Sequence, residues 1–172
     1  RECHLCEVGK VAHNVGSVSC STCGAGKFGE IGPVCSECYE GHYREGDAAS
    51  ALSCEACPAG FYQATKGQAS CLPCVPGKYQ DDDNGITCKE CAVNEFANET
   101  KMTQCLICEI GKLAANPGSV SCSVCGAGKY GAAGPVCTYC QPGRFRKDDA
   151  ASDATSALSC KPCLAGFYQE AQ

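Results

Sequence analysis

The sequence contains no tryptophan, a single methionine and few large aliphatic side chains. Leu, Ile, Val and Phe together account for 26 of 172 residues, about 15%, whereas a packed core normally requires roughly 20% or more. This shortage excludes a conventional globular domain and an enzyme that depends on a deep apolar pocket. We therefore expect no catalytic residues, no cofactor and no resident metal ion.

The sequence also lacks concentrated positive charge and long apolar runs. Fourteen Lys and Arg stand against nineteen Asp and Glu, which gives a formal net charge of −5. Only Arg144, Arg146 and Lys147 form a local basic group, so nucleic acid is not an expected partner. No apolar run approaches the roughly 18 residues of a membrane-spanning helix, and we expect no direct membrane insertion of this segment.

Cysteine, by contrast, is abundant: its 20 residues form ten C-x-x-C pairs. The second cysteines of successive pairs are 17, 15, 19, 17, 17, 17, 17, 15 and 23 residues apart. Such regular spacing predicts small stacked units, each too small to fold alone. The high cysteine content indicates that covalent cross-links replace a large apolar core.

A longer repeat is superimposed on the short one. Residues 3–63 align with 105–169 at an offset of 102, with 40 of 61 positions identical and a four-residue insertion, 153–156, in the second copy. We therefore divide the chain into a first super-repeat of six C-x-x-C units, 1–104, and a partial second super-repeat, 105–172. Neither end has an atypical capping unit, and we expect the chain to be a fragment of a longer array.

Two positions recur after the second cysteine of each pair. The third residue after the second cysteine is Gly in nine units and Asn94 in the remaining one, which predicts a left-handed backbone conformation at this position. The fifth residue on is aromatic in eight units, and we expect these rings to form a miniature core over the disulfides rather than a binding stripe. Asn84-Gly85 predicts a type I′ turn.

Four chemistries use C-x-x-C pairs. Haem attachment is excluded because no pair is followed by His, and a single redox site is excluded by the number of pairs. Zinc is the serious alternative, since four thiolates suit a tetrahedral ion. Zinc sites would group the pairs two by two, whereas the pairs here are evenly spaced, so we favour disulfides.

Even spacing favours a ladder in which the second Cys of each pair bonds the first Cys of the next. The predicted bonds are Cys6–Cys20, Cys23–Cys35, Cys38–Cys54, Cys57–Cys71, Cys74–Cys88, Cys91–Cys105, Cys108–Cys122, Cys125–Cys137 and Cys140–Cys160. Cys3 and Cys163 are then expected to bond outside the fragment. A crossed scheme, in which Cys3 bonds Cys20 and Cys6 bonds Cys23, is the alternative.

The unit C-x-x-G-x-[FY]…[ST]-C-x-x-C, seen as CGAGKFGEIGPVCSEC and CPAGFYQATKGQASCLPC, resembles the tumour-necrosis-factor-receptor-like and ephrin-receptor-like cysteine-rich repeats. In receptors of the first kind the Cys before the Gly and the aromatic bonds the first Cys of the next pair, which agrees with the ladder. The chain lacks their alternating crossed module and is also similar to arrays in secreted and flagellar-hair proteins of unicellular eukaryotes.

Two further features have a possible functional meaning. Asn98-Glu99-Thr100 is an N-glycosylation sequon, and we expect a glycan on Asn98. Asp81, Asp82 and Asp83 could suggest calcium, but the closing Glu of a calcium loop is not in place, so a solvated loop tip is favoured.

The sequence thus predicts small disulfide-rich repeats, arranged as an elongated rod of stacked short β-hairpin modules linked in a disulfide ladder, with little helix. We expect a structural, secreted or cell-surface extracellular protein, a segment of a fibre, sheath or appendage. Its expected partners are copies of itself or neighbouring repeats, and glycans. The alternative is a ligand-binding receptor or adhesion ectodomain.

Overall fold

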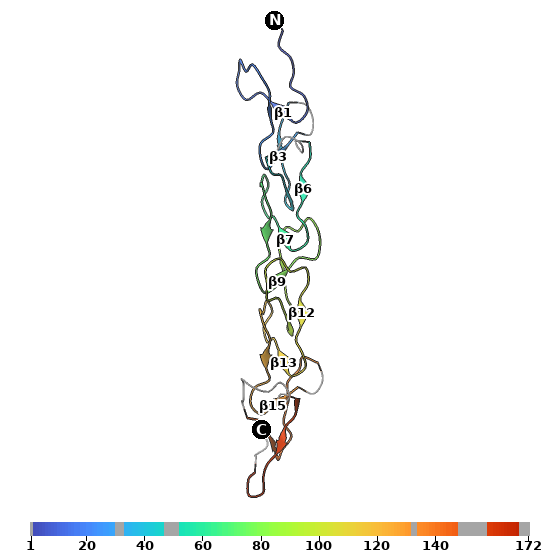
Figure 1. Cartoon of the computed structure of the whole chain (residues 1–172), viewed down its shortest axis with the longest axis vertical. Coiled ribbons are helices and arrows are strands. Elements are labelled where there is room, and N and C mark those ends of the chain that lie inside the picture. The colour runs from blue at the N-terminus through green and yellow to red at the C-terminus, as the bar shows by residue number, and fades with distance from the viewer. Residues whose placement is uncertain (1, 30–32, 47–51, 132–133, 148–157, 169–172) are drawn as a thin grey trace. The chain divides into compact units, whose positions relative to one another are not determined.

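The computed structural model describes residues 2–29, 33–46, 52–131, 134–147 and 158–168 (Figure 1). They form two compact parts. The first part is Arg1–Cys74, Gln80–Lys89 and Lys101–Thr103, and the second is Val75–Tyr79, Glu90–Thr100 and Gln104–Gln172. The four-residue insertion at 153–156 lies outside the described residues.

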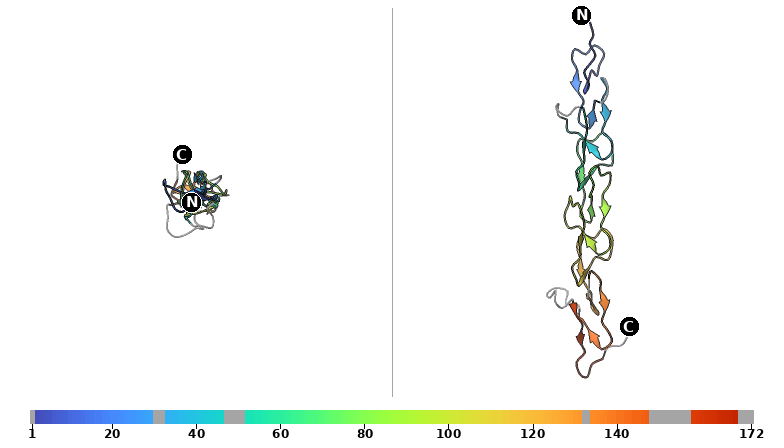
Figure 2. Two further views of the ribbon diagram at one scale, coloured as in Figure 1. Left: turned by 90° about the horizontal axis from the view of Figure 1, so that it is seen from above. Right: turned by 90° about the vertical axis from the view of Figure 1, so that its right-hand side faces the viewer.

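The described residues form two-residue strands and no α-helix (Figures 1 and 2). The strands are β1 (Lys10–Val11), β2 (Ser21–Thr22), β3 (Lys27–Phe28), β4 (Ser36–Glu37), β5 (His42–Tyr43), β6 (Glu55–Ala56), β7 (Phe61–Tyr62), β8 (Leu72–Pro73), β9 (Lys78–Tyr79), β10 (Lys89–Glu90), β11 (Glu95–Phe96), β12 (Leu106–Ile107), β13 (Lys112–Leu113), β14 (Ser123–Val124), β15 (Lys129–Tyr130), β16 (Thr138–Tyr139), β17 (Arg144–Phe145) and β18 (Lys161–Pro162). In the described part of the chain each odd-numbered strand pairs with the next strand to give nine two-stranded sheets. The prediction of short hairpin modules with little helix is confirmed.

Each hairpin joins two consecutive C-x-x-C units. In β7 and β8, for example, Phe61 pairs with Pro73 and Tyr62 with Leu72 in antiparallel register. The first strand therefore holds the fourth and fifth residues after a second cysteine, and the second strand holds the two residues inside the following pair. We call each unit a module, named by the second cysteine of its pair.

A backbone hydrogen bond accompanies every hairpin. The amide of the second cysteine in each following pair donates to the carbonyl three residues after the preceding second cysteine, as Cys74 does to Gly60 at 2.9 Å. The equivalent bonds from Cys23 to Cys163 all measure 2.8–3.0 Å. The spacing of Cys and Gly along the sequence thus sets the register of every hairpin.

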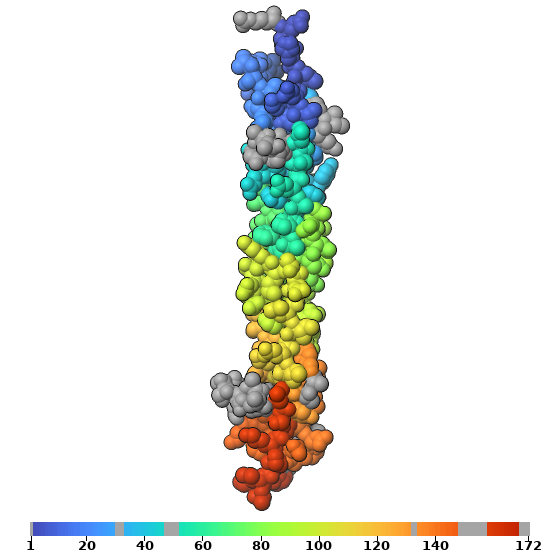
Figure 3. All heavy atoms as spheres, turned by 45° about the vertical axis from the view of Figure 1, so that its right-hand side comes forward, coloured from blue at the N-terminus to red at the C-terminus, as the bar shows by residue number. Residues whose placement is uncertain are grey.

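Most of the buried apolar side chains in the modules are cysteines. The buried apolar side chains are eight second cysteines, Cys160, Ala97 and Ala114. Large aliphatic side chains lie mainly at the surface, as expected for a chain with too few of them to build a core. Within each part, the residue colours in the space-filling view follow chain order, because modules pack on those nearest in sequence (Figure 3).

Candidate functional site: the joints between modules

The first element of the joint between two modules is a disulfide. The structure joins Cys6–Cys20, Cys23–Cys35, Cys38–Cys54, Cys57–Cys71, Cys74–Cys88, Cys91–Cys105, Cys108–Cys122, Cys125–Cys137 and Cys140–Cys160. This is the arrangement of the ladder and not of the crossed scheme. Cys3 and Cys163 are free thiols, and their bonding beyond this chain stays a prediction.

The second element is the left-handed residue three positions after each second cysteine. All nine glycines at this position have φ between 72° and 89°, and Asn94 has φ 69°, which confirms the sequence prediction. In six modules the amide at this position donates to the carbonyl of the sixth residue after the next second cysteine, as in Gly60 to Gln80 at 2.8 Å. This conformation turns the chain so that consecutive modules share a backbone hydrogen bond.

The third element is a loop residue that reaches the preceding module. In four modules the backbone amide of the tenth residue after the second cysteine donates a hydrogen bond to the carbonyl of the second cysteine in the preceding module. The bonds run from Gly67 to Cys38, from Asn84 to Cys57, from Lys101 to Cys74 and from Gly118 to Cys91, at 2.8–2.9 Å. These four residues also have φ between 64° and 70°. Asn84 is therefore left-handed because of this joint, whereas Gly85 has no positive φ, so the predicted type I′ turn is wrong.

The same loop residue also touches the module two places earlier. A Cβ built on Gly60 would lie 2.3 Å from the carbonyl oxygen of Lys101, and one on Gly41 would lie 2.2 Å from that of Asn84. Gly26 and Gly77 have the same relationship to Gly67 and Gly118. Glycine is thus required at these positions by close approach as well as by φ, and each loop contacts two preceding modules.

The aromatic position is not the buried centre of the module, and this prediction is wrong. Residues at this position are half-buried in nine modules and Tyr168 is 82% exposed. Successive side chains of a strand point to opposite faces, so the residue after the aromatic points inward instead.

The inward position is the sixth residue after the second cysteine. The sequence does not reveal it, because its residues have no common chemistry. Among the described residues it holds Ala12, Gly29, Arg44, Gln63, Gln80, Ala97, Ala114, Gly131 and Arg146, and all of these except the exposed Ala12 are buried. In soluble proteins Arg and Gln are seldom fully buried unless they are paired. The hydrogen bonds of these Arg and Gln side chains therefore explain how they can be buried inside the modules.

The two buried glutamines brace their own loops. The Gln80 side-chain amide donates to the Thr87 carbonyl at 2.6 Å, and its oxygen accepts from the amide of Asp82 at 3.1 Å. Gln63 does the same with the Ser70 carbonyl and the Thr65 amide. Each glutamine thus ties the start of its loop to the residue before the next cysteine.

The two buried arginines reach into the preceding module. Nη1 of Arg44 donates to the carbonyls of Cys23, Gly24 and Lys27 at 2.8, 2.9 and 2.5 Å. Arg44 is 1% exposed, and carbonyl dipoles compensate the charge that it carries into the interior.

Arg146 repeats the arrangement one super-repeat later. Its Nη1 donates to the carbonyls of Cys125, Gly126 and Lys129, each 102 residues after the corresponding acceptor of Arg44. This arginine joint therefore recurs with the period of the super-repeat.

The remaining sequence candidates lie at the surface. Asn98 is exposed in the loop between β11 and β12, and its glycosylation stays a prediction. Lys89 Nζ donates to Asp81 and, at 3.0 Å, to Asp82, which lowers the pKa of the Asp81 carboxyl. Asp83 accepts from the amide of Ala59 at 3.0 Å. Among the described residues no group of three or more His, Cys, Asp or Glu could hold a metal ion.

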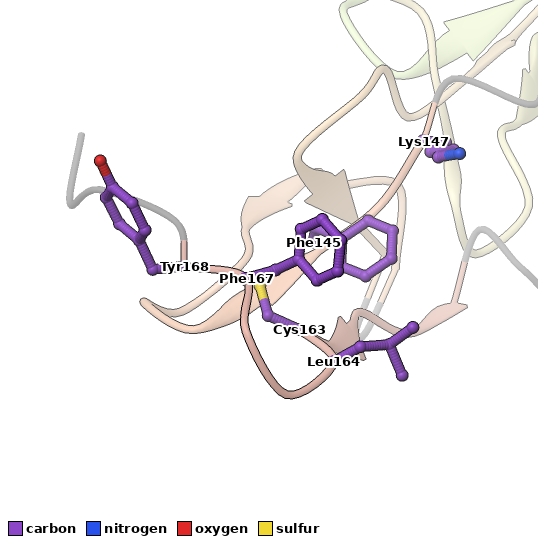
Figure 4. Close-up of a pocket in the computed structure, with 6 residues that line it drawn as sticks. All are labelled: Phe145, Lys147, Cys163, Leu164, Phe167 and Tyr168. Atoms are coloured by element: carbon purple, nitrogen blue, oxygen red, sulfur yellow. The ribbon is translucent and has the colours of Figure 1, made fainter.

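An apolar pocket of about 460 Å³ lies beside the free Cys163. Phe145, Leu164, Phe167 and Tyr168 are among the residues that line it (Figure 4). In the first super-repeat the residue equivalent to Cys163 is Cys57, which is bonded to Cys71. Cys163 thus lies at the edge of the pocket as a free thiol, whereas its counterpart Cys57 takes part in a joint.

Two overlapping segments, 26–67 and 60–103, match the protein family described as Tyrosine-protein kinase ephrin type A/B receptor-like. The first match begins at Gly26 and ends at Gly67, the pair of residues in close approach described above. No curated protein matches the chain. In the part of the chain that the structure describes, no helix has the length and apolarity needed to cross a membrane.

Proposed function

From the two ephrin-receptor-like cysteine-rich repeats in this chain, we propose a structural role as a segment of an extracellular fibre, sheath or cell-surface appendage. The repeat family is non-catalytic, and many disulfides together with such repeats indicate an extracellular domain. The observation that carries the proposal is the recurrence of whole joints, represented by Arg44 and Arg146, at the period of the super-repeat.

The interior side chains support this role because they serve the joints. The buried cysteines are bonded between modules, the buried glutamines brace loops, and the buried arginines bind the preceding module. Each disulfide closes a loop of 12–20 residues, and a loop of about 15 residues contributes about 3 kcal/mol in the chain-entropy model. Such a chain resists unfolding without needing a ligand or a large core.

The exposed apolar residues supply repeated contacts for assembly. Four exposed positions of the first super-repeat are again exposed and apolar 102 residues later: Leu5 and Ile107, Val8 and Ile110, Val18 and Val120, Val34 and Val136. A surface that recurs at a fixed interval can make the same contact with each copy of itself or with neighbouring repeats. Glycans on the surface would add to these contacts.

Electron microscopy of the native material tests the proposal. We expect fibres or sheaths that loosen when a reductant cleaves the disulfides and that do not respond to chelators, because no metal ion takes part. A native protein that is a soluble monomer, with 3–63 and 105–169 in unrelated surroundings, would contradict the structural role.

The second candidate is a ligand-binding receptor or adhesion ectodomain, which the name of the matched family favours. The full open reading frame distinguishes the two candidates. A structural array is expected to continue as many further modules, whereas a receptor is expected to lead into a membrane-spanning helix and an intracellular signalling domain.

A further inference from the structure

A short turn, residues 109–112, leads from β12 into β13 and carries an exposed ion pair (Figure 1). The amide of Lys112 donates to the carbonyl of Glu109 at 3.0 Å, and Nζ of Lys112 lies 2.8 Å from Oε2 of Glu109. The side chains are 36% exposed for Lys112 and 78% exposed for Glu109. The turn therefore presents one positive and one negative group side by side at the surface.

Exposed aliphatic side chains accompany this ion pair. Ile110 lies within the turn, between the two charged residues in sequence, and is 54% exposed, whereas Ile107 at the end of β12 is 68% exposed. The Cα atoms of the bonded Cys108 and Cys122 are 5.8 Å apart. This disulfide brings Val120, which is 51% exposed and two residues before Cys122, close to the same turn. We call the following five residues the Glu–Lys patch: Ile107, Glu109, Ile110, Lys112 and Val120.

The Glu–Lys patch occurs again one super-repeat earlier. Lys10 and Glu7 form the same ion pair at 2.8 Å, across a turn closed by the same backbone hydrogen bond at 3.0 Å. The equivalent aliphatic side chains are also exposed: Leu5, Val8 and Val18.

The sequence limits this patch to one module in six. No other C-x-x-C unit has Leu, Ile or Val both directly before the second cysteine and two residues after it. No other unit has Glu directly after the second cysteine. The patch is therefore a feature of the super-repeat and not of the single module.

We propose that the Glu–Lys patch is a self-association site that docks on the same patch of a second copy of this chain. A two-fold axis through the contact places the glutamate of each patch against the lysine of the other, so all four charges stay paired while the aliphatic side chains leave water. A partner with charges of only one sign leaves one member of each ion pair unmatched. The inference rests on the structural role proposed above and supplies its contact.

The number of patches determines the size of the assembly. An isologous contact uses one patch from each of two chains. A chain with one patch can therefore form only a dimer, whereas a chain with two patches can bind two further copies and extend the assembly.

Exchange of charges between two variants tests the pairing. One variant combines Glu7→Lys with Glu109→Lys, and the other combines Lys10→Glu with Lys112→Glu. We expect each variant alone to associate at least about tenfold more weakly than the unsubstituted patches, because like charges then face each other. An equal mixture of the two variants should recover association, since each patch then meets its opposite charge.

Serine substitutions test the aliphatic part. Ile107→Ser with Ile110→Ser leaves one intact patch per chain and should stop assembly at the dimer. Val75→Ser with Val93→Ser is the matched control, because these side chains are 55% and 49% exposed but lie in modules without the patch. The control should assemble beyond the dimer as the unsubstituted chain does.

Sedimentation velocity over a series of concentrations measures the association. Every protein is the full chain with Cys3→Ser and Cys163→Ser, which removes association through the free thiols. The substituted side chains are exposed, so Tm should change by less than about 2 °C in each variant.

Three results would overturn the inference: unsubstituted patches that leave the chain monomeric at every concentration, a mixture of charge variants that does not recover association, or a control as defective as the isoleucine variant. Electron microscopy distinguishes this failure from that of the structural role. Fibres that form unchanged with substituted patches would overturn the docking site alone, whereas native material without fibres would contradict the structural role itself.

Discussion

The carbonyl oxygen of Lys101 lies 2.3 Å from the point at which a Cβ on Gly60 would be placed. These residues belong to modules two apart in the sequence, so a single missing side chain allows a loop to contact a module that is not its neighbour. The backbone of Gly60 has φ 84°, and the position is therefore closed to other residues on two separate grounds.

Gly60→Ala should destabilise the protein by about 3 kcal/mol, because it combines left-handed strain with a backbone clash. Gly16→Ala is the matched control: Gly16 has φ 81°, but no atom lies within 4 Å of its added Cβ. The control should cost about 1 kcal/mol. Denaturant unfolding with the disulfides intact measures the free energy of unfolding of both variants. Equal destabilisation by the two substitutions would show that the close approach at Gly60 does not affect stability.

Gln80→Ala should destabilise the protein by about 2 kcal/mol, since it leaves the Thr87 carbonyl without its buried donor. Gln68→Ala serves as the control, because Gln68 is exposed and its side chain bonds only the nearby Lys66 carbonyl. The expected cost of the control is below about 0.5 kcal/mol.

Gly85→Ala extends this test to a coupled pair. A Cβ on Gly85 would lie 2.6 Å from the side-chain nitrogen of Gln80, so alanine should be costly in the wild type and nearly neutral once Gln80 is also alanine. A double-mutant cycle should give a coupling energy of about 1 kcal/mol or more. Additive effects would contradict the packing described here.

Peptide mapping of the oxidised protein should find Cys57 bonded to Cys71 and Cys74 bonded to Cys88. The intact mass should be lower by two hydrogens for each bridge and should contain no metal. A peptide that joins Cys54 to Cys71 would instead support the crossed scheme and would remove the covalent ladder.

Asn98 should carry an N-glycan when the chain is secreted from a eukaryotic cell. Enzymatic removal of N-glycans should reduce the mass of the wild type and leave Asn98→Gln unchanged, whereas Thr100→Ser should keep the glycan because it preserves the sequon. An unchanged wild-type mass after the enzyme treatment would exclude the modification.

Lys89→Gln should raise the pKa of Asp81 toward its ordinary value, because the ammonium group of Lys89 is the main cause of its lowering. A carboxyl with a lowered pKa stabilises the fold above its unfolded pKa of about 3.9, and this stabilisation is lost as the pH falls through the folded value. The effect on stability is small because both groups are exposed. NMR titration of the Asp81 carboxyl, with Lys112→Gln as the control, measures the shift.

The sequence was sufficient to predict the hairpin modules and the left-handed glycines. Both depend on local rules: cysteine spacing defines the module, and Gly and Asn are the residues that adopt a left-handed φ most readily. The buried position occupied by Arg44, Gln63 and Ala97 could not be found in this way. Its residues differ in size and polarity, and the position is recognisable only from its burial in the folded chain.

The aromatic prediction failed for a related reason. Large rings suggest a core when apolar material is scarce, but the small interior of a module is already filled by the disulfide and one inward side chain. Tyr62 is half-buried whereas the adjacent Gln63 is 4% exposed. A satisfied polar side chain can thus take the interior position that hydrophobicity alone would assign to its neighbour.

The contact between modules two apart restricts how such a chain can grow by gene duplication. Asn94 is the left-handed residue of the Cys91 module, and the Cys125–Cys137 loop belongs to the module two places later. The separation of 12 in that loop is shorter than the 14 of the preceding Cys108–Cys122 loop. Copying the Cys108 module alone would bring a loop of separation 14 opposite this asparagine, in the place where Gly60 and Gly77 leave room for a carbonyl group. Copying six modules keeps every loop opposite its original partner. Duplication with the 102-residue period therefore avoids this mismatch.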